Sequence, residues 1–166
     1  LYLLLRYTHY MYKTIILSLG LMFTLLLSNE HNETKQLSYD QSLSLLQTIH
    51  DDAMILGSGK TGVYVFVDPL CPHSRKFITM VSKKPMMLSK YQYHILLYGI
   101  PRLKSEDVVS SVYLSPNPIN RLLEIMVEDK VTHDKGNEMI QAKVDRIESV
   151  AKEMHVNKRP YIFIVN

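Results

Sequence analysis

A single cysteine, Cys71, is the residue of this sequence best suited to covalent chemistry. It lies in VYVFVDPLCPHSRKF, residues 63–77, where an apolar run breaks into a turn and a proline follows the thiol. At the start of a helix, unpaired backbone N–H groups and the positive end of the helix dipole favour a thiolate. Because thiolates are nucleophiles, Cys71 is a candidate reactive residue. The alternative is a buried apolar side chain, the usual fate of a lone cysteine.

The residues that follow Cys71 bear on what its thiol could do. Pro72 suits a first helical position because it has no N–H to lose. His73 and Arg75 could stabilise a thiolate if they turn toward the sulfur, and Ser74 could donate a hydrogen bond to it. With Ser74 three places on and no second cysteine, an internal disulfide cannot form. A lone thiol can still form mixed disulfides with other molecules and pass them on.

The apolar pattern predicts the elements that would position Cys71. Residues 63–67 form a run of β-branched and aromatic side chains, typical of a buried strand, and residues 91–98 and 161–165 resemble it. Helical spacing runs through 38–54, 72–81, 105–113, 117–126 and 137–154. Glycine-rich residues 57–62 lack the spacing of a phosphate loop and indicate a connector. The order of elements predicts an α/β domain.

Composition narrows the class of protein. A chain of 166 residues with 46% hydrophobic and 21% charged residues predicts one globular domain. The formal charge is +3, and setting Arg6 and Lys13 aside reduces 19 basic residues to 17, against 16 acidic ones. This balance gives no indication of a nucleic-acid surface. The seven histidines lack metal-ligand spacing, so we expect no metal site, and no cofactor is indicated.

The N-terminal residues are typical of a targeting segment. If translation starts at Met11, Lys13 precedes an uncharged run over 14–28, which has the length of a signal peptide. The small residues of a cleavage site are imperfect here, so an uncleaved membrane anchor remains open. We therefore expect residues 1–28 to be a signal peptide or membrane anchor, and the remainder to be periplasmic or tethered to the inner membrane.

The motif and the order of elements together resemble the bacterial Dsb family, whose members are exported thioredoxin-fold proteins. VFVDPLCPHSRKF resembles the family's active-site segment, and Pro72-His73 is the inner dipeptide of DsbA. YHILLYGIPRLKSEDVVSSVYLSP resembles the strand, loop and helical insertion of DsbC and DsbG, the thiol:disulfide interchange proteins closest in arrangement. HVNKRPYIFIVN resembles the segment that carries a cis-proline before a strand.

This resemblance implies a thioredoxin-like fold with a helical insertion, over residues 60–166, preceded by a tether and linker helix over 29–59. It implies that Cys71 is the nucleophile and that Pro160 is the cis-proline lying against it. Arg159 would bind the backbone of an extended peptide substrate, and its charge could favour a thiolate and acidic substrates. The alternatives are that Arg159 points to solvent and that Pro160 is an ordinary trans proline.

The sequence departs from the family pattern at three places. Ser74 replaces the resolving cysteine, which excludes dithiol oxidation or reduction by this chain alone. The segment before residue 42 is too short for the dimerisation domain of the family isomerases. The sequence stops after the strand that follows Pro160, where the family adds another strand and a helix, so the resemblance predicts a fold truncated at the C-terminus.

These features predict an exported thiol–disulfide exchange protein of the isomerase type that acts through one cysteine by mixed disulfides. Its partners would be proteins with disulfides or thiols and a membrane redox partner, without nucleic acid. Two alternatives remain: a non-catalytic peptide-binding domain, and an inactive truncated relative.

Overall fold

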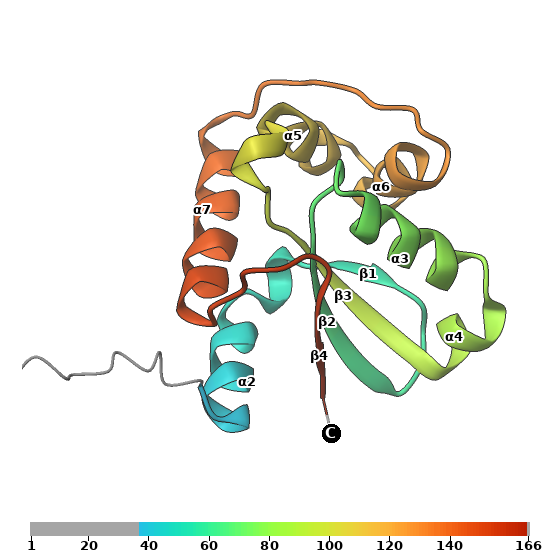
Figure 1. Ribbon diagram of the computed structural model, residues 1–166, viewed down its shortest axis with the longest axis vertical. Coiled ribbons are helices and arrows are strands. Elements are labelled where there is room, and N and C mark those ends of the chain that lie inside the picture. The colour runs from blue at the N-terminus through green and yellow to red at the C-terminus, as the bar shows by residue number, and fades with distance from the viewer. Residues whose placement is uncertain (1–36, 166) are drawn as a thin grey trace, which may run out of the picture. The chain divides into compact units, whose positions relative to one another are not determined.

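A computed structural model describes residues 37–165 of the chain (Figure 1). Four strands form one sheet in the order β1-β3-β2-β4. Parallel pairing joins β2 to β3, and antiparallel pairing joins β1 to β3 and β4 to β2. The strands are β1 (Met54–Leu56), β2 (Thr61–Val67), β3 (Tyr91–Leu97) and β4 (Tyr161–Ile164).

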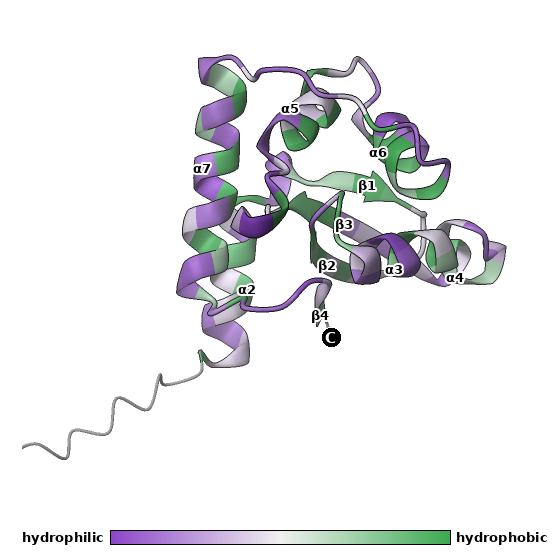
Figure 2. Ribbon diagram, turned by 45° about the horizontal axis from the view of Figure 1, so that its top comes forward, coloured by the Kyte–Doolittle hydropathy of each residue, from purple (hydrophilic) through white to green (hydrophobic). Residues whose placement is uncertain are grey.

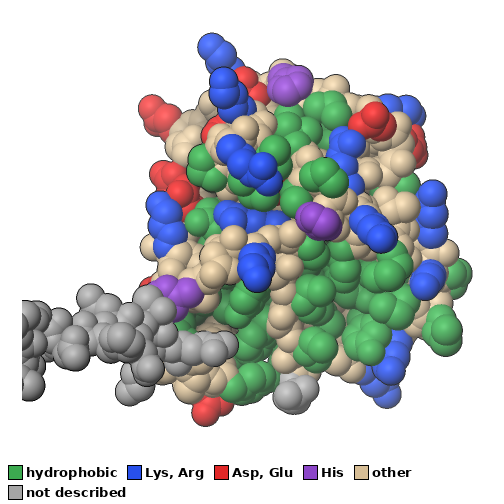
Figure 3. All heavy atoms as spheres, in the orientation of Figure 1, with side chains coloured by type: hydrophobic (Ala, Val, Ile, Leu, Met, Phe, Trp, Pro, Cys, Tyr) green, Lys and Arg blue, Asp and Glu red, His purple; other side chains and the backbone are tan. Residues whose placement is uncertain are grey.

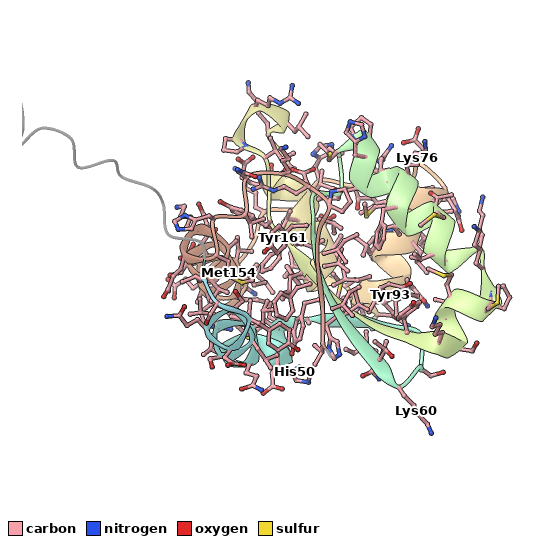
Figure 4. All side chains as sticks on the ribbon, turned by 60° about the horizontal axis from the view of Figure 1, so that its bottom comes forward. His50, Lys60, Lys76, Tyr93, Met154 and Tyr161 are labelled. Carbon is pink, nitrogen blue, oxygen red and sulfur yellow. The ribbon has the colours of Figure 1, made fainter. Side chains whose placement is uncertain are left out.

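Helices cover both faces of this sheet. In Figures 1 and 4, α3 and α4 lie on one side of it, and α2 and α7 lie on the other. The helices are α2 (Tyr39–Thr48), α3 (Pro72–Ser82), α4 (Pro85–Lys90), α5 (Glu106–Leu114), α6 (Pro118–Val127) and α7 (Glu138–Glu153). Two 3₁₀ turns, η1 (His50–Asp52) and η2 (Pro101–Leu103), complete the set. Helices α5 and α6 contact each other, and α6 also contacts α3.

The core of the protein includes a continuous buried run in β2. Every residue from Val63 to Val67 is buried, because β2 lies in the interior of the sheet and is covered on both faces. Figure 2 shows β2 as mostly hydrophobic and β3 as partly hydrophobic and partly hydrophilic, whereas α7 carries hydrophobic and polar residues around its circumference. On α7 the buried residues are Ile140, Ile147, Val150 and Ala151, at the spacing of one helix face.

The elements predicted from 63–67, 72–81, 91–98, 105–113, 117–126, 137–154 and 161–165 are all present within one or two residues. The helix predicted over 38–54 is wrong at its end, since it stops at Thr48 and residues 54–56 form β1. Because β1 pairs with β3, the sheet begins before residue 60, inside the segment predicted as a linker. The short helix α4 was not predicted.

Steric reasons account for the glycines between β1 and β2. Gly57 adopts φ +87°, and a Cβ on Gly59 would lie 2.0 Å from the Lys90 carbonyl carbon.

The predicted signal peptide or anchor, residues 1–28, lies outside the described residues. Within residues 37–165, no helix is long and apolar enough to cross a bilayer.

Candidate functional site

Cys71 lies where β2 passes into α3, at the carboxyl end of the parallel strands. It is the N-cap residue of α3, and its carbonyl accepts the Arg75 N–H at 2.9 Å, the first bond of that helix. Its thiol is free, and the residue as a whole is only 5% exposed. The Cys71 Sγ donates toward the carbonyl oxygen of Arg159, 3.9 Å away and 88 residues distant in the sequence. Cys71 and the segment with Arg159, which the sequence predicted to lie against it, therefore meet in the fold.

The carboxylate of Asp68 organises the turn before the thiol. Its Oδ1 accepts the N–H groups of Leu70 at 2.7 Å and of Cys71 at 3.1 Å. Its Oδ2 accepts the Ile100 N–H at 2.5 Å and the Ser105 hydroxyl at 2.7 Å. Asp68 is fully buried, and these four donors offset the cost of removing a carboxylate from water.

Sequence reasoning missed this role of Asp68. The available signal was an aspartate directly after a buried strand and before a proline, since such residues often accept hydrogen bonds from the next backbone N–H groups. No comparable signal marked Ser105, which is 37 residues away in the sequence.

Ser74 has a different partner from the predicted one. It is fully buried, and its Oγ accepts the backbone N–H of Asp68 at 3.3 Å. Among the hydrogen bonds of residues 37–165, none joins Ser74 to the Cys71 sulfur. The serine therefore closes the turn onto the first part of α3.

Arg159 and Pro160 form the opposite wall of the site, joined by a cis peptide bond, as the resemblance implies. The Arg159 side chain is partly buried, so the alternative that it points freely to solvent is wrong. Its Nε and Nη2 donate to the carbonyl oxygens of Tyr98 and Gly99, each at 3.1 Å. The guanidinium carbon also lies 3.8 Å from the centroid of the Tyr98 aromatic ring. The guanidinium of Arg159, which was predicted to favour a thiolate or acidic substrates, is therefore hydrogen-bonded to the loop after β3.

Of the other residues near Cys71, Pro72 and His73 face solvent, whereas Arg75 bonds to other parts of the protein. Pro72 and His73 are exposed on the first turn of α3. Arg75 donates to the carbonyls of Pro69 at 2.9 Å and Ile125 at 2.8 Å. It also forms an ion pair with Asp129 at 2.7 Å. These contacts direct Arg75 to the turn and to α6, so it is a brace of the site.

A second polar cluster lies on the α2 side of the sheet. Tyr64 and His94 stack with their ring centroids 4.8 Å apart, and the centroid of His50 lies 4.7 Å from that of His94. Figure 4 labels His50. The His50 Nδ1 and the Tyr64 hydroxyl are 2.7 Å apart. The buried His94 Nδ1 has no hydrogen-bond partner, and burial, followed by the nearby His50, lowers the pKa of His94.

Burial also raises the pKa of Tyr113 far above its usual range. The Tyr113 hydroxyl accepts the N–H of Leu97 at 3.1 Å, and this bond fixes the end of β3 from which the loop toward Ser105 departs.

Across residues 37–165, no group of three or more histidine, cysteine, aspartate or glutamate side chains is arranged to hold a metal ion.

No family model and no curated protein matches the chain. Solved structures do match. A disulfide interchange protein from Neisseria gonorrhoeae is 18% identical, with 68% of this chain and 79% of that chain covered and a TM-score of 0.55. Proteus mirabilis ScsC in a transitional conformation is 12% identical, with 94% and 84% covered and a TM-score of 0.53. The thiol-disulfide exchange protein α-DsbA2 from Wolbachia pipientis is 12% identical, with 76% and 86% covered and a TM-score of 0.50.

These structures and the strand order define the fold. The chain has a mixed α/β thioredoxin-like fold with a helical insertion, formed by α5 and α6 between β3 and α7. It shares this fold with thiol–disulfide exchange proteins of the DsbA-like and ScsC type. The closer likeness to DsbC and DsbG rests on the sequence motifs alone.

Proposed function

We propose that the protein exchanges thiols and disulfides of polypeptides through Cys71. The observation that supports this most strongly is the meeting of Cys71 Sγ with the Arg159 carbonyl beside a cis Pro160. Cys71 is also the N-cap residue of α3, at the end of the helix where backbone N–H groups lack intrahelical partners. An extended peptide could pair with the backbone before Pro160 and bring its disulfide to this sulfur.

The exchange needs no external oxidant. The Cys71 thiolate attacks one sulfur of a substrate disulfide, forms a mixed disulfide, and displaces the other sulfur as a thiolate. A substrate thiolate then attacks the substrate sulfur of the mixed disulfide, forms a new substrate disulfide, and returns Cys71 as a thiolate. The numbers of thiols and disulfides stay constant, which is consistent with a site that holds a serine at position 74.

The setting of this activity is part of the proposal. Residues 1–28 would direct the chain to the periplasm or anchor it in the inner membrane. Exported polypeptides with disulfides would be its substrates, and a membrane protein could serve as a redox partner.

A second candidate function is peptide binding without chemistry. The burial of Cys71 favours it, because a residue that is only 5% exposed offers little surface for attack. In that case the backbone beside Pro160 would hold extended segments and the thiol would be structural.

Trapping of mixed disulfides separates the two functions. The protein is mixed with a scrambled-disulfide substrate, quenched with an alkylating agent, and separated without reductant. We expect a covalent adduct with the wild type and none with Cys71→Ser. The matched control carries Cys71→Ser together with Ser149→Cys, which moves the single thiol to an exposed position on α7. Equal adduct formation by the wild type and this control would overturn the exchange function.

Binding of a labelled, cysteine-free extended peptide completes the experiment. If Cys71→Ser and the wild type bind the peptide equally and neither forms adducts, peptide binding is the function. Loss of both readouts would indicate an inactive relative.

A further inference from the structure

The hydrogen bonds around the thiol form a closed path. From Cys71 the path runs through its N–H to Asp68, and from Asp68 to the Ile100 N–H of the loop after β3. Earlier in that loop, the Tyr98 carbonyl accepts the Arg159 side chain, and the Arg159 carbonyl faces the Cys71 sulfur. We call this path, with loop 98–105 as its middle part, the hydrogen-bonded circuit.

Loop 98–105 is held from two sides by side chains of opposite charge. The Asp68 carboxylate accepts from Ile100 and Ser105, and the Arg159 guanidinium donates to the Tyr98 and Gly99 carbonyls. Hydrogen bonds with a charged donor or acceptor are shorter and stronger than neutral ones. The Tyr98 N–H also donates to the Val67 carbonyl at 2.9 Å, which ties the loop to the end of β2.

Each charged group thus connects the loop to one wall of the thiol site. Asp68 belongs to the turn that carries Cys71, and Arg159 belongs to the segment that would bind substrate. Neither side chain has solvent as its main partner: Asp68 is fully buried and Arg159 is partly buried. A shift of the loop would therefore move both walls.

We propose that Arg159 and Asp68 are paired positioning residues, which set the distance between the Cys71 sulfur and the peptide-binding backbone by holding loop 98–105 between them. The proposal rests on the exchange function and assigns Arg159 a different role from direct attraction of acidic substrates. It predicts that breaking the circuit impairs attack on a disulfide presented by an extended peptide. Attack on a small disulfide that makes no backbone contacts should be spared.

The test compares two disulfides with one leaving group. One is dithiobis(nitrobenzoate), and the other is an extended peptide whose cysteine carries thionitrobenzoate. Release of thionitrobenzoate gives a second-order rate constant for each, and the readout is the ratio of the peptide rate constant to the small-disulfide rate constant. A general loss of folded protein lowers both rate constants and leaves the ratio unchanged.

Arg159→Ala should lower this ratio roughly tenfold, the effect expected from losing charge-assisted hydrogen bonds. Arg159→Lys should lower it almost as much, because an ammonium cannot bind two carbonyls in the planar geometry of a guanidinium and stack on Tyr98. Full rescue by lysine would show that charge alone matters and would overturn the proposal. The matched control is Lys158→Ala, which removes a neighbouring exposed charge and should leave the ratio unchanged.

Ser105→Ala is a smaller change that removes one of the two hydrogen bonds between Asp68 and loop 98–105. We expect the ratio to fall roughly fivefold, the effect of one lost hydrogen bond. If the two residues act through one loop, the double variant with Arg159→Ala should fall little further than Arg159→Ala alone. Effects that multiply would show independent action and would overturn the pairing.

Amide hydrogen exchange tests the circuit separately from the chemistry. Arg159→Ala should accelerate exchange of the Ile100 amide, whose hydrogen bond is to Asp68, and Lys158→Ala should not. Unchanged Ile100 exchange in Arg159→Ala would overturn the circuit even in an active enzyme. The exchange function and the circuit can fail separately. If the wild type attacks neither disulfide but Arg159→Ala still accelerates exchange of the Ile100 amide, the exchange function is refuted and the circuit is supported.

Discussion

Two buried polar clusters, one around Asp68 beyond the end of β2 and one around His94 in β3, differ in how completely they are hydrogen-bonded. At the carboxyl ends of the strands, Asp68 accepts four hydrogen bonds and is fully buried. On the α2 side, His94 is also buried, but its Nδ1 has no partner. A satisfied polar network fixes a geometry, whereas an unsatisfied one lowers stability and makes it depend on solution conditions. The difference indicates that the Asp68 cluster fixes the geometry of its surroundings, whereas the histidine cluster around His94 does not.

The two sides of the sheet also differ at the surface, where hydrophobic side chains gather on the side of α3. Figure 3 shows hydrophobic side chains gathered on one part of the visible face, over β4, α3 and α4. Exposed members of these elements are Ile162, Ile164, Met80 and Met86. They lie on the α3 side of the sheet, away from the histidine cluster.

The largest expected effect comes from removing the centre of the satisfied cluster. Asp68→Ala removes the carboxylate that accepts four hydrogen bonds, two of them from the buried residues Cys71 and Ser105, and we expect a loss of about 3 to 5 kcal/mol in the free energy of unfolding. Urea denaturation followed by circular dichroism measures it. Asp129→Asn, at an exposed aspartate, is the control and should change the value by less than about 1 kcal/mol, since asparagine also tolerates the backbone φ of 61° found there. Equal effects would remove the distinction between the buried and exposed carboxylates.

A smaller loss is expected at the brace of the same site. Arg75→Leu removes hydrogen bonds to the Pro69 and Ile125 carbonyls together with the ion pair to Asp129. We expect a loss of about 2 kcal/mol, mostly from the carbonyl contacts because the Asp129 side chain is 79% exposed. Asp129→Asn isolates the ion pair in the same denaturation experiment. If Asp129→Asn accounts for the whole loss, the brace is electrostatic.

The unsatisfied cluster should reveal itself through pH. Since burial and His50 lower the pKa of His94, the unfolded chain binds a proton at a higher pH than the folded one. Stability is therefore retained above the ordinary histidine pKa of about 6.5 and lost as the pH falls below it. His94→Phe should weaken this acid sensitivity while leaving stability near neutral pH intact.

Thermal midpoints over a series of pH values below and above neutrality measure that response. The same substitution at exposed His133 is the control for loss of a histidine. An acid response of His94→Phe as steep as that of the wild type would show that other groups cause it.

The smallest effect is expected at the one side-chain hydrogen bond of the histidine cluster. Tyr64→Phe removes the hydroxyl that lies 2.7 Å from His50 Nδ1, and we expect a loss of at most about 1 kcal/mol because the pair is only partly buried. Chemical denaturation at neutral pH measures this change. A loss as large as that of Asp68→Ala would mean that the two clusters stabilise the fold equally.

Most of the elements could be predicted from the sequence because their signals are local. The run over 63–67 and the helical spacing over 137–154 each lie within one element, and β2 and α7 formed there. The strand β1 was missed because its three residues are too few to show a period. Its identity as a strand depends on pairing with β3, far along the chain.

The sequence by itself determined that a lone thiol follows a buried strand and opens a helix, since both neighbours of Cys71 are encoded next to it. Only the tertiary structure decided the partners of Asp68, Ser74 and Arg159. The Arg159 side chain crosses 61 residues of sequence to reach Tyr98, and no local pattern records which carbonyls lie within its reach. Side-chain hydrogen bonds depend on distances of about 3 Å, and only the packed fold sets those distances.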